Sequence, residues 1–112
     1  MKKGGAPIYE LRHYIPVPGK EAAILGRFKT YTFDIFRRLG LTMVDFWVDA
    51  NGTGDIWYVM EWPADVDWDG RWNAYRADPE WIAVKTASEK DGPIVQTTDV
   101  VRLVRPVFVK PA

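Results

Sequence analysis

The order of hydrophobic periodicities along the chain is the feature that most restricts its fold. Four segments alternate or are rich in β-branched residues as strands are: residues 8–15, 41–49, 55–62 and 94–109. Between them, residues 19–39 and about 64–90 place apolar side chains at helical spacing. The order strand, helix, strand, strand, helix, strand is that of an α+β, ferredoxin-like fold with an antiparallel sheet. We expect a single domain over residues 7–109, preceded by a short flexible N-terminus at residues 1–6.

Glycines and prolines mark the ends of these segments. Gly40 is a natural stop for the first helix, and the glycine-rich stretch at residues 50–54 predicts a hairpin turn. Gly26 lies inside the first helix, where glycine costs about 1 kcal/mol relative to alanine. We therefore expect Gly26 to pack closely against another element.

The second helical region is interrupted by the sequence Asp78-Pro79-Glu80-Trp81. An N-cap aspartate, a proline at the first helical position and an acidic first turn are typical of a helix start. A new helix is thus predicted to begin here. We expect the Trp81 indole to point back toward the sheet beside Trp72 or Phe28, as core packing or as the wall of a pocket.

Composition excludes several function classes. Fifteen basic and fifteen acidic residues cancel, so no overall field favours nucleic acid or a membrane, and no apolar run is long enough to span one. The chain has no cysteine, one histidine (His13) and one serine (Ser88), which argues against a catalytic triad and a structural metal site. We expect a soluble, cytoplasmic protein without metal or cofactor. The acidic run at residues 65–70 opens like a calcium loop, but Arg76 occupies the position of the final glutamate, so these acids are predicted to lie at a helix start.

The alternation along the strands predicts which face of the sheet lies under the helices. One face avoids charge, and it holds Tyr9, Leu11, His13, Val44, Phe46, Val48, Ile56, Tyr58 and Met60. We expect this face to lie under the helices. The opposite face mixes charge with large aromatic residues: Glu10, Arg12, Tyr14, Asp45, Trp47, Trp57 and Glu61. Such a face is typical of an interface, so Tyr14, Trp47 and Trp57 are predicted to contact a second copy in a homodimer.

A pocket between sheet and helices is the expected position of any ligand site. His13 is a candidate base or hydrogen-bond partner, with Tyr58 as a second polar group. The apolar walls would come from Tyr9, Phe28, Trp72 and Trp81. The alternatives are that His13 is a satisfied core residue or a heme ligand.

Several short motifs resemble those of the NIPSNAP family. They are Ile8-Tyr9-Glu10-Leu11-Arg12, Pro18-Gly19, Phe46-Trp47 and the segment from Trp72 to Trp81 that ends in Asp-Pro-Glu-Trp. The resemblance covers residues 7–109, and Asp45 departs from the glycine that the family commonly has before Phe-Trp. It implies a dimeric α+β barrel in which two sheets close face to face. It implies no catalytic mechanism.

Three functional hypotheses follow. The first is a dimeric barrel that binds, and in its stronger form also transforms, a small apolar or aromatic molecule between sheet and helices. The second is a dimeric interaction module without chemistry. The third, by analogy of fold alone, is a heme-handling protein or a cofactor-independent monooxygenase.

Overall fold

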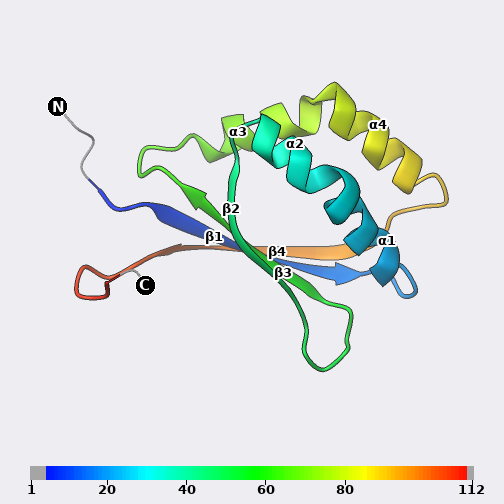
Figure 1. Ribbon diagram of the computed structural model, residues 1–112, viewed down its shortest axis with the longest axis horizontal. Coiled ribbons are helices and arrows are strands. Elements are labelled where there is room, and N and C mark those ends of the chain that lie inside the picture. Colours follow the sequence, from blue (N-terminus) through cyan, green and yellow to red (C-terminus); the bar gives the residue numbers. More distant parts are fainter. Residues whose placement is uncertain (1–4, 111–112) are drawn as a thin grey trace.

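The computed structural model describes residues 5–110, and its four strands form one antiparallel sheet (Figure 1). The strands are β1 (Ile8–Pro16), β2 (Thr42–Val48), β3 (Ile56–Trp62) and β4 (Val95–Val104), in the spatial order β2-β3-β1-β4. This order confirms the predicted ferredoxin-like fold. β4 ends earlier than the sequence indicated. Of the N-terminus predicted to be flexible, residues 1–4 lie outside the described residues.

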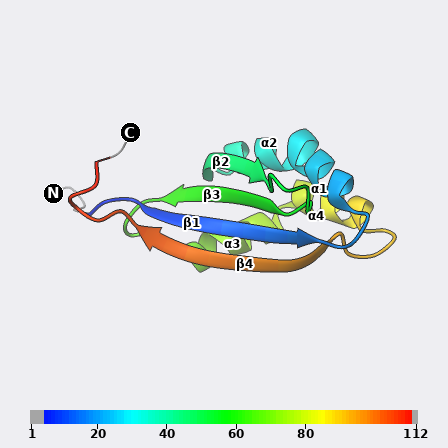
Figure 2. The same ribbon diagram turned by 90° about the horizontal axis from the view of Figure 1, so that it is seen from below.

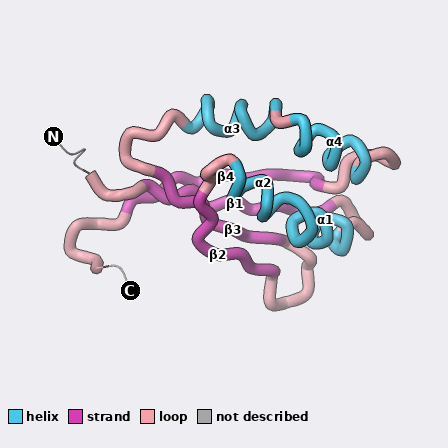
Figure 3. Tube along the Cα trace, turned by 45° about the horizontal axis from the view of Figure 1, so that its top comes forward, coloured by secondary structure: helices cyan, strands magenta, loops and turns pink. Residues whose placement is uncertain are grey.

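The helices cover one face of this sheet. They are α1 (Glu21–Arg27), the π-helical turn η1 (Phe28–Thr32), α2 (Phe33–Arg38), α3 (Trp68–Ala77) and α4 (Pro79–Ser88). The row α1-η1-α2 runs beside the row α3-α4 (Figure 3). Seen from below, the sheet stands in front of the helices, and within residues 5–110 no element covers this second face (Figure 2). We call it the open face. None of the helices described is long and apolar enough to cross a membrane.

The first helical region contains a feature that its periodicity does not indicate. The five residues of η1 form a π-helical turn between α1 and α2, a local widening that is frequent near functional sites. Gly26, just before this turn, is exposed, and a Cβ built on it would meet nothing within 4 Å. The prediction that Gly26 is needed for close packing is therefore wrong.

Both acidic helix starts are confirmed. Asp67 is the N-cap of α3, and its carboxylate accepts a hydrogen bond of 3.0 Å from the amide of Gly70. Asp78 is the N-cap of α4, and its carboxylate accepts a hydrogen bond of 3.1 Å from the amide of Trp81. The side chain of Arg38 also binds the Asp78 carboxylate, at 2.7 Å. The Asp78 cap thus connects α4 to the end of α2.

The face of β1 that lies under the helices is the opposite of the one predicted. In the antiparallel pairing of β1 with β3, Glu10 faces Met60 and Arg12 faces Tyr58, and directly opposed residues share one side of a sheet. Met60 and Tyr58 are buried beneath the helices, as expected for β3. Glu10 and Arg12 therefore point into the helix–sheet layer. The prediction was wrong for β1 because it assumed that charged side chains avoid the core.

The prediction for β2 is only partly correct. Phe46 packs against the buried core, as expected. Val44 lies at an irregularity in the pairing of β2 with β3 and is 51% exposed. Val48 is equally exposed near the end of the strand. A bulge at Val44 removes this residue from the regular alternation on which the prediction rested.

Candidate functional site

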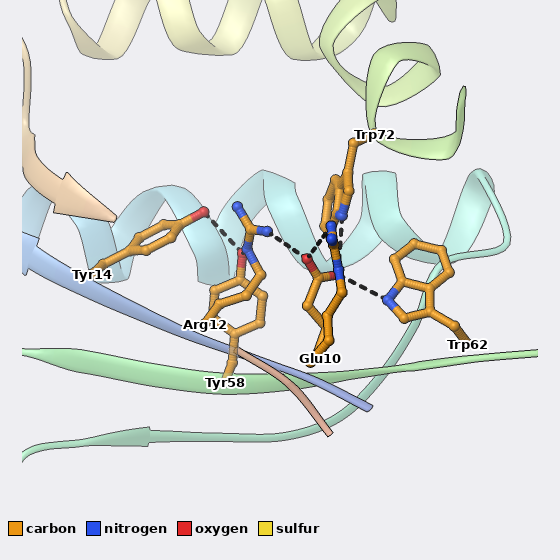
Figure 4. Close-up of polar contacts among 7 residues, drawn as sticks. Glu10, Arg12, Tyr14, Tyr58, Trp62 and Trp72 are labelled. Carbon is orange, nitrogen blue, oxygen red and sulfur yellow. Dashed lines mark hydrogen bonds and ion pairs between the residues drawn. The ribbon is translucent and has the colours of Figure 1, made fainter. Parts of the chain in front are cut away.

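A fully buried carboxylate lies at the centre of the helix–sheet layer (Figure 4). The side chain of Glu10 has no exposed surface, and its Oε1 accepts hydrogen bonds from the indole nitrogens of Trp62 at 2.8 Å and Trp72 at 3.0 Å. Its Oε2 accepts a hydrogen bond of 3.1 Å from Arg12 and lies 3.5 Å from the guanidinium of Arg102. Donors from β1, β3, β4 and α3 therefore converge on one carboxylate, which offsets the cost of burying its charge.

The guanidinium of Arg12 connects this carboxylate to a pair of tyrosines. The Arg12 Nε donates a hydrogen bond of 2.9 Å to the Tyr58 hydroxyl, and the guanidinium carbon lies 4.5 Å from the ring centroid of Trp72. Burial by itself lowers the pKa of Arg12, but Tyr58, Tyr14 and Glu10 raise the net pKa above its ordinary value. Arg12 is therefore a permanent cation with a fixed orientation.

Tyr58 and Tyr14 complete the chain of polar contacts. Their hydroxyl oxygens lie 2.9 Å apart, and their rings meet edge to face at 5.5 Å. Tyr58 is 1% exposed, and burial is the main reason why its pKa lies well above the ordinary value of a tyrosine. Tyr14 is only partly buried and reaches the surface of a cleft. The Tyr58 hydroxyl is consequently neutral at physiological pH and can donate a hydrogen bond.

Two adjoining clefts open between β1 and β4 on one side and α3 and α4 on the other. The first, of about 340 Å³, is lined by Arg12, Tyr14, Arg27, Trp72, Tyr75, Arg76, Trp81, Lys85, Glu89, Pro93, Val95, Gln96 and Thr98. The second, of about 460 Å³, is lined by Glu10, Arg12, Asp69, Trp72, Arg76, Val100 and Arg102. Because both share Arg12, Trp72 and Arg76, we treat them as one site and call it the β4 cleft.

The β4 cleft contains two of the residues predicted to bind a ligand, Trp72 and Trp81. The Trp81 ring stacks on Tyr75 at 4.8 Å, and Tyr75 in turn meets the edge of Trp72. Trp81 is 7% exposed, so it serves both as core packing and as a wall of the cleft. The expected neighbours of Trp81 were Trp72 or Phe28, whereas its stacking partner is Tyr75. Burial raises the pKa of Tyr75, which keeps this wall uncharged.

Phe28 and Tyr58 lie deeper than the lining. Phe28 is 3% exposed and packs against Tyr58 at 5.3 Å and Phe46 at 5.0 Å. It is a core residue of the helix–sheet layer. Tyr58 contacts the cleft through Tyr14 and Arg12.

His13 and Tyr9 lie on the open face, away from the β4 cleft. His13 pairs with Trp57 of β3, and the two rings stack at 3.8 Å with an interplanar angle of 4°. Its Nε2 lies 2.7 Å from the Asp55 carboxylate, and its Nδ1 lies 3.7 Å from that of Asp99. The prediction that His13 and Tyr58 share a cavity is wrong, because His13 of β1 lies on the open face, whereas Tyr58 of β3 is buried under the helices.

The remaining predicted site residues divide between the two faces. The Tyr9 hydroxyl accepts a hydrogen bond of 3.2 Å from Arg105, near the C-terminal end of β4. Of the residues predicted for a dimer interface, Trp47 and Trp57 face each other across β2 and β3 on the open face. Tyr14 lies instead under the helices and lines the β4 cleft. The prediction that Tyr14 lies on the open face is therefore wrong. As for His13, the two faces of β1 are exchanged relative to the prediction.

The sequence prediction did not include Glu10 and Arg12 in the site. A signal was available, because the two residues have opposite charges and stand two positions apart on one strand, where their side chains share a face. The convergence of two indoles on Glu10 could not be derived from this spacing, since Trp62 and Trp72 are 52 and 62 positions away.

Comparison with known proteins gives a consistent picture. The NIPSNAP family model matches residues 9–108. No curated protein matches the chain in sequence at a significant level.

Several solved structures share the fold. A NIPSNAP-like domain protein from Burkholderia xenovorans is 18% identical, with a TM-score of 0.77, 94% of this chain covered and 90% of that one. A NIPSNAP family protein from Agrobacterium tumefaciens is 16% identical, with a TM-score of 0.78 and 92% and 96% covered. A second, of unknown function, from the same organism is 20% identical, with a TM-score of 0.71 and 87% and 86% covered. Together with the family match over almost the whole chain, these findings lead to one conclusion: the chain belongs to the NIPSNAP family.

Proposed function

We propose that this protein binds a small molecule with an aromatic or apolar body in the β4 cleft. The observation that supports this proposal most strongly is the meeting of Arg12, Tyr14 and Trp72 at one opening. Sites for small molecules typically measure about 300–1,000 Å³ and combine apolar walls with a few convergent polar groups. Both parts of the β4 cleft fall within this range.

A pair of substitutions on one strand tests the proposal. Thr98 lines the cleft opposite Tyr14, whereas Thr97 is also exposed but faces the open side of β4. Thr98→Trp should fill the cleft without removing a core residue, and Thr97→Trp is the matched control. Calorimetric titration with 2-naphthol and 2-naphthoate should detect binding by the wild type and by Thr97→Trp, but not by Thr98→Trp. A wild type that binds neither probe, or equal binding by both variants, contradicts the proposal.

A second function, homodimerisation through the open face, is favoured by a different observation. Trp47, Val101 and Leu103 lie on this face and are 47%, 50% and 46% exposed. An apolar patch of this kind on an uncovered sheet is typical of an interface. A second copy packed face to face would cover it and enclose His13 with its two carboxylate neighbours. In this arrangement the open face is an interaction module, separate from the β4 cleft.

The test of the dimer is the molecular mass in solution. Sedimentation of the wild type at micromolar concentration should give twice the chain mass, and Trp47→Glu should give the monomer. Ile82→Glu is the control, because Ile82 has a similar exposure of 49% but lies on α4. A monomeric wild type would exclude this second function. A cytoplasmic location stays a prediction of the sequence.

A further inference from the structure

We infer that the ligand of the β4 cleft carries a carboxylate, recognised by Tyr14, Arg12 and Arg76. This inference rests on the proposed binding function and specifies the charge and chemical class of the ligand. Two independent observations support it: the direction in which the hydrogen bonds of the polar chain run, and the balance of charge around the cleft.

The first observation is that the polar chain of Arg12, Tyr58 and Tyr14 ends in a hydroxyl at the cleft. Arginine can only donate, so the Tyr58 oxygen accepts from Arg12 Nε at 2.9 Å. The Tyr58 hydroxyl is buried, and its hydrogen is satisfied when it donates to the Tyr14 oxygen, 2.9 Å away. With Tyr14 accepting from Tyr58, the Tyr14 hydrogen remains for a partner in the cleft that Tyr14 lines. The partner that fits a donor of this kind is an acceptor oxygen.

The second observation is an excess of positive charge around the cleft. Five cationic residues line its two parts, against three acidic ones: Arg12, Arg27, Arg76, Lys85 and Arg102, against Glu10, Asp69 and Glu89. The chain as a whole has zero net charge, so this excess is local. Such a local field attracts anions.

Arg76 is an exposed cation of this site. Its Nη2 donates 3.1 Å to the amide oxygen of Asn73, a neutral acceptor. Arg27 and Lys85 differ in this respect, since both donate at 2.9 Å to the carboxylate of Glu89. Arg76 is therefore more available than Arg27 or Lys85 to form an ion pair with a ligand. A planar guanidinium matches a carboxylate in geometry, and its two parallel donors can engage both oxygens.

The walls of the cleft define the rest of the ligand. Trp72, Tyr75 and Trp81 form an aromatic wall on the helix side, in which Tyr75 stacks on Trp81 at 4.8 Å and meets Trp72 edge to face at 5.7 Å. An unsaturated body can pack against this wall while its carboxylate reaches Tyr14 and the arginines. An aromatic or conjugated monocarboxylate satisfies both requirements.

A matched pair of probes separates this inference from the proposal on which it rests. 2-Naphthoate and 2-naphthamide have the same body and nearly the same shape, but only naphthoate is an anion at neutral pH. Calorimetric titration of the wild type should show naphthoate binding at least about tenfold tighter, the size expected for a charge-assisted hydrogen bond. Arg76→Gln should reduce this preference, and Tyr14→Phe should weaken naphthoate binding while the ring stays in place.

Arg37→Gln is the control, because Arg37 is likewise an exposed helical arginine with a partner three residues earlier but lies on α2. It should leave both affinities unchanged. Equal affinity for the two probes, or a naphthoate preference that survives Arg76→Gln, overturns the carboxylate inference and leaves binding in the cleft standing. Failure of 2-naphthoate and 2-naphthamide to bind while 2-naphthol binds overturns only the carboxylate inference, whereas failure of all three to bind overturns the proposed function itself.

Discussion

The carboxylate of Glu10 accepts a hydrogen bond of 3.0 Å from the indole nitrogen of Trp72, although the two residues stand 62 positions apart. This bond joins β1 to α3 in the interior. The same carboxylate accepts from Arg12, whose guanidinium lies 4.5 Å from the centre of the Trp72 ring. One buried residue therefore positions both the cation and an aromatic wall of the β4 cleft.

Neutralising this carboxylate should destabilise the fold strongly. Glu10→Gln keeps the size of the side chain but leaves Arg12, whose side chain is 13% exposed, without its closest counter-charge. Loss of one partner from a buried ion pair typically costs about 3 kcal/mol or more. Urea unfolding should show a loss of this size, whereas Glu61→Gln, on the open face of β3, should change the free energy of unfolding by less than about 0.5 kcal/mol. A small effect at Glu10 would contradict this role of the buried carboxylate.

Tyr58→Phe should affect both stability and ligand preference. The phenyl ring keeps the packing against Phe28, but the Arg12 Nε and the Tyr14 hydroxyl lose a hydrogen-bond partner. The expected cost is about 1–3 kcal/mol. Because Tyr14 is then no longer held as a donor toward the cleft, the preference for 2-naphthoate over 2-naphthamide should also fall. Tyr31→Phe, at a tyrosine that is 45% exposed, is the control; a loss of stability with an unchanged preference would restrict Tyr58 to a structural role.

Removing the cap of α4 should cost less than removing the core carboxylate. Asp78→Ala deletes the acceptor for the amide of Trp81 and the partner of Arg38. Loss of an N-cap costs roughly 0.5–2 kcal/mol. Chemical denaturation should give a value in this range, and Asp91→Ala in the exposed turn before β4 should have almost no effect. An unchanged midpoint for Asp78→Ala would show that α4 does not depend on its cap.

The same residue should make stability depend on pH. The hydrogen bond from Arg38, and secondarily that from the amide of Trp81, lowers the pKa of Asp78 below its ordinary value of 3.8. As the pH falls, the unfolded chain therefore binds a proton at this position before the folded chain does. The contribution of the Asp78 carboxylate to the free energy of unfolding is fully present above the unfolded-state pKa. It is lost as the pH falls through the lower, folded-state pKa.

Asp78→Asn tests this dependence, because asparagine is also a good N-cap but has no charge. Thermal unfolding between pH 6 and pH 2 should show a smaller decrease in midpoint for Asp78→Asn than for the wild type. Asp34→Asn, in an exposed pair with Arg37, is the control. Parallel curves for the wild type and Asp78→Asn would contradict the assigned cause.

Much of the fold and part of the site could be predicted from sequence. Trp72 and Trp81 are buried between the helices and the sheet, as predicted, because the periodicity of α3 and the Asp78 cap orient them through local geometry. The helical spacing of residues 19–39 gave no sign of η1, since a π-helical turn shifts the register by one residue without changing which residue types are used. Glu10, Arg12 and Tyr14 were assigned to the wrong face, so the polar residues of the β4 cleft were missed.

The sequence by itself determined the order of the strands and helices, the hairpin at residues 50–54 and the starts of α3 and α4, because periodicity, turn residues and caps act over a few neighbouring residues. Only the tertiary structure decided which face of β1 lies under the helices. A glutamate can be buried there because four elements bring donors to it, from Trp62, Trp72, Arg12 and Arg102. Of these partners only Arg12 is near it in sequence. That balance between the cost of burying a charge and the hydrogen bonds that offset it exists only once the chain has folded.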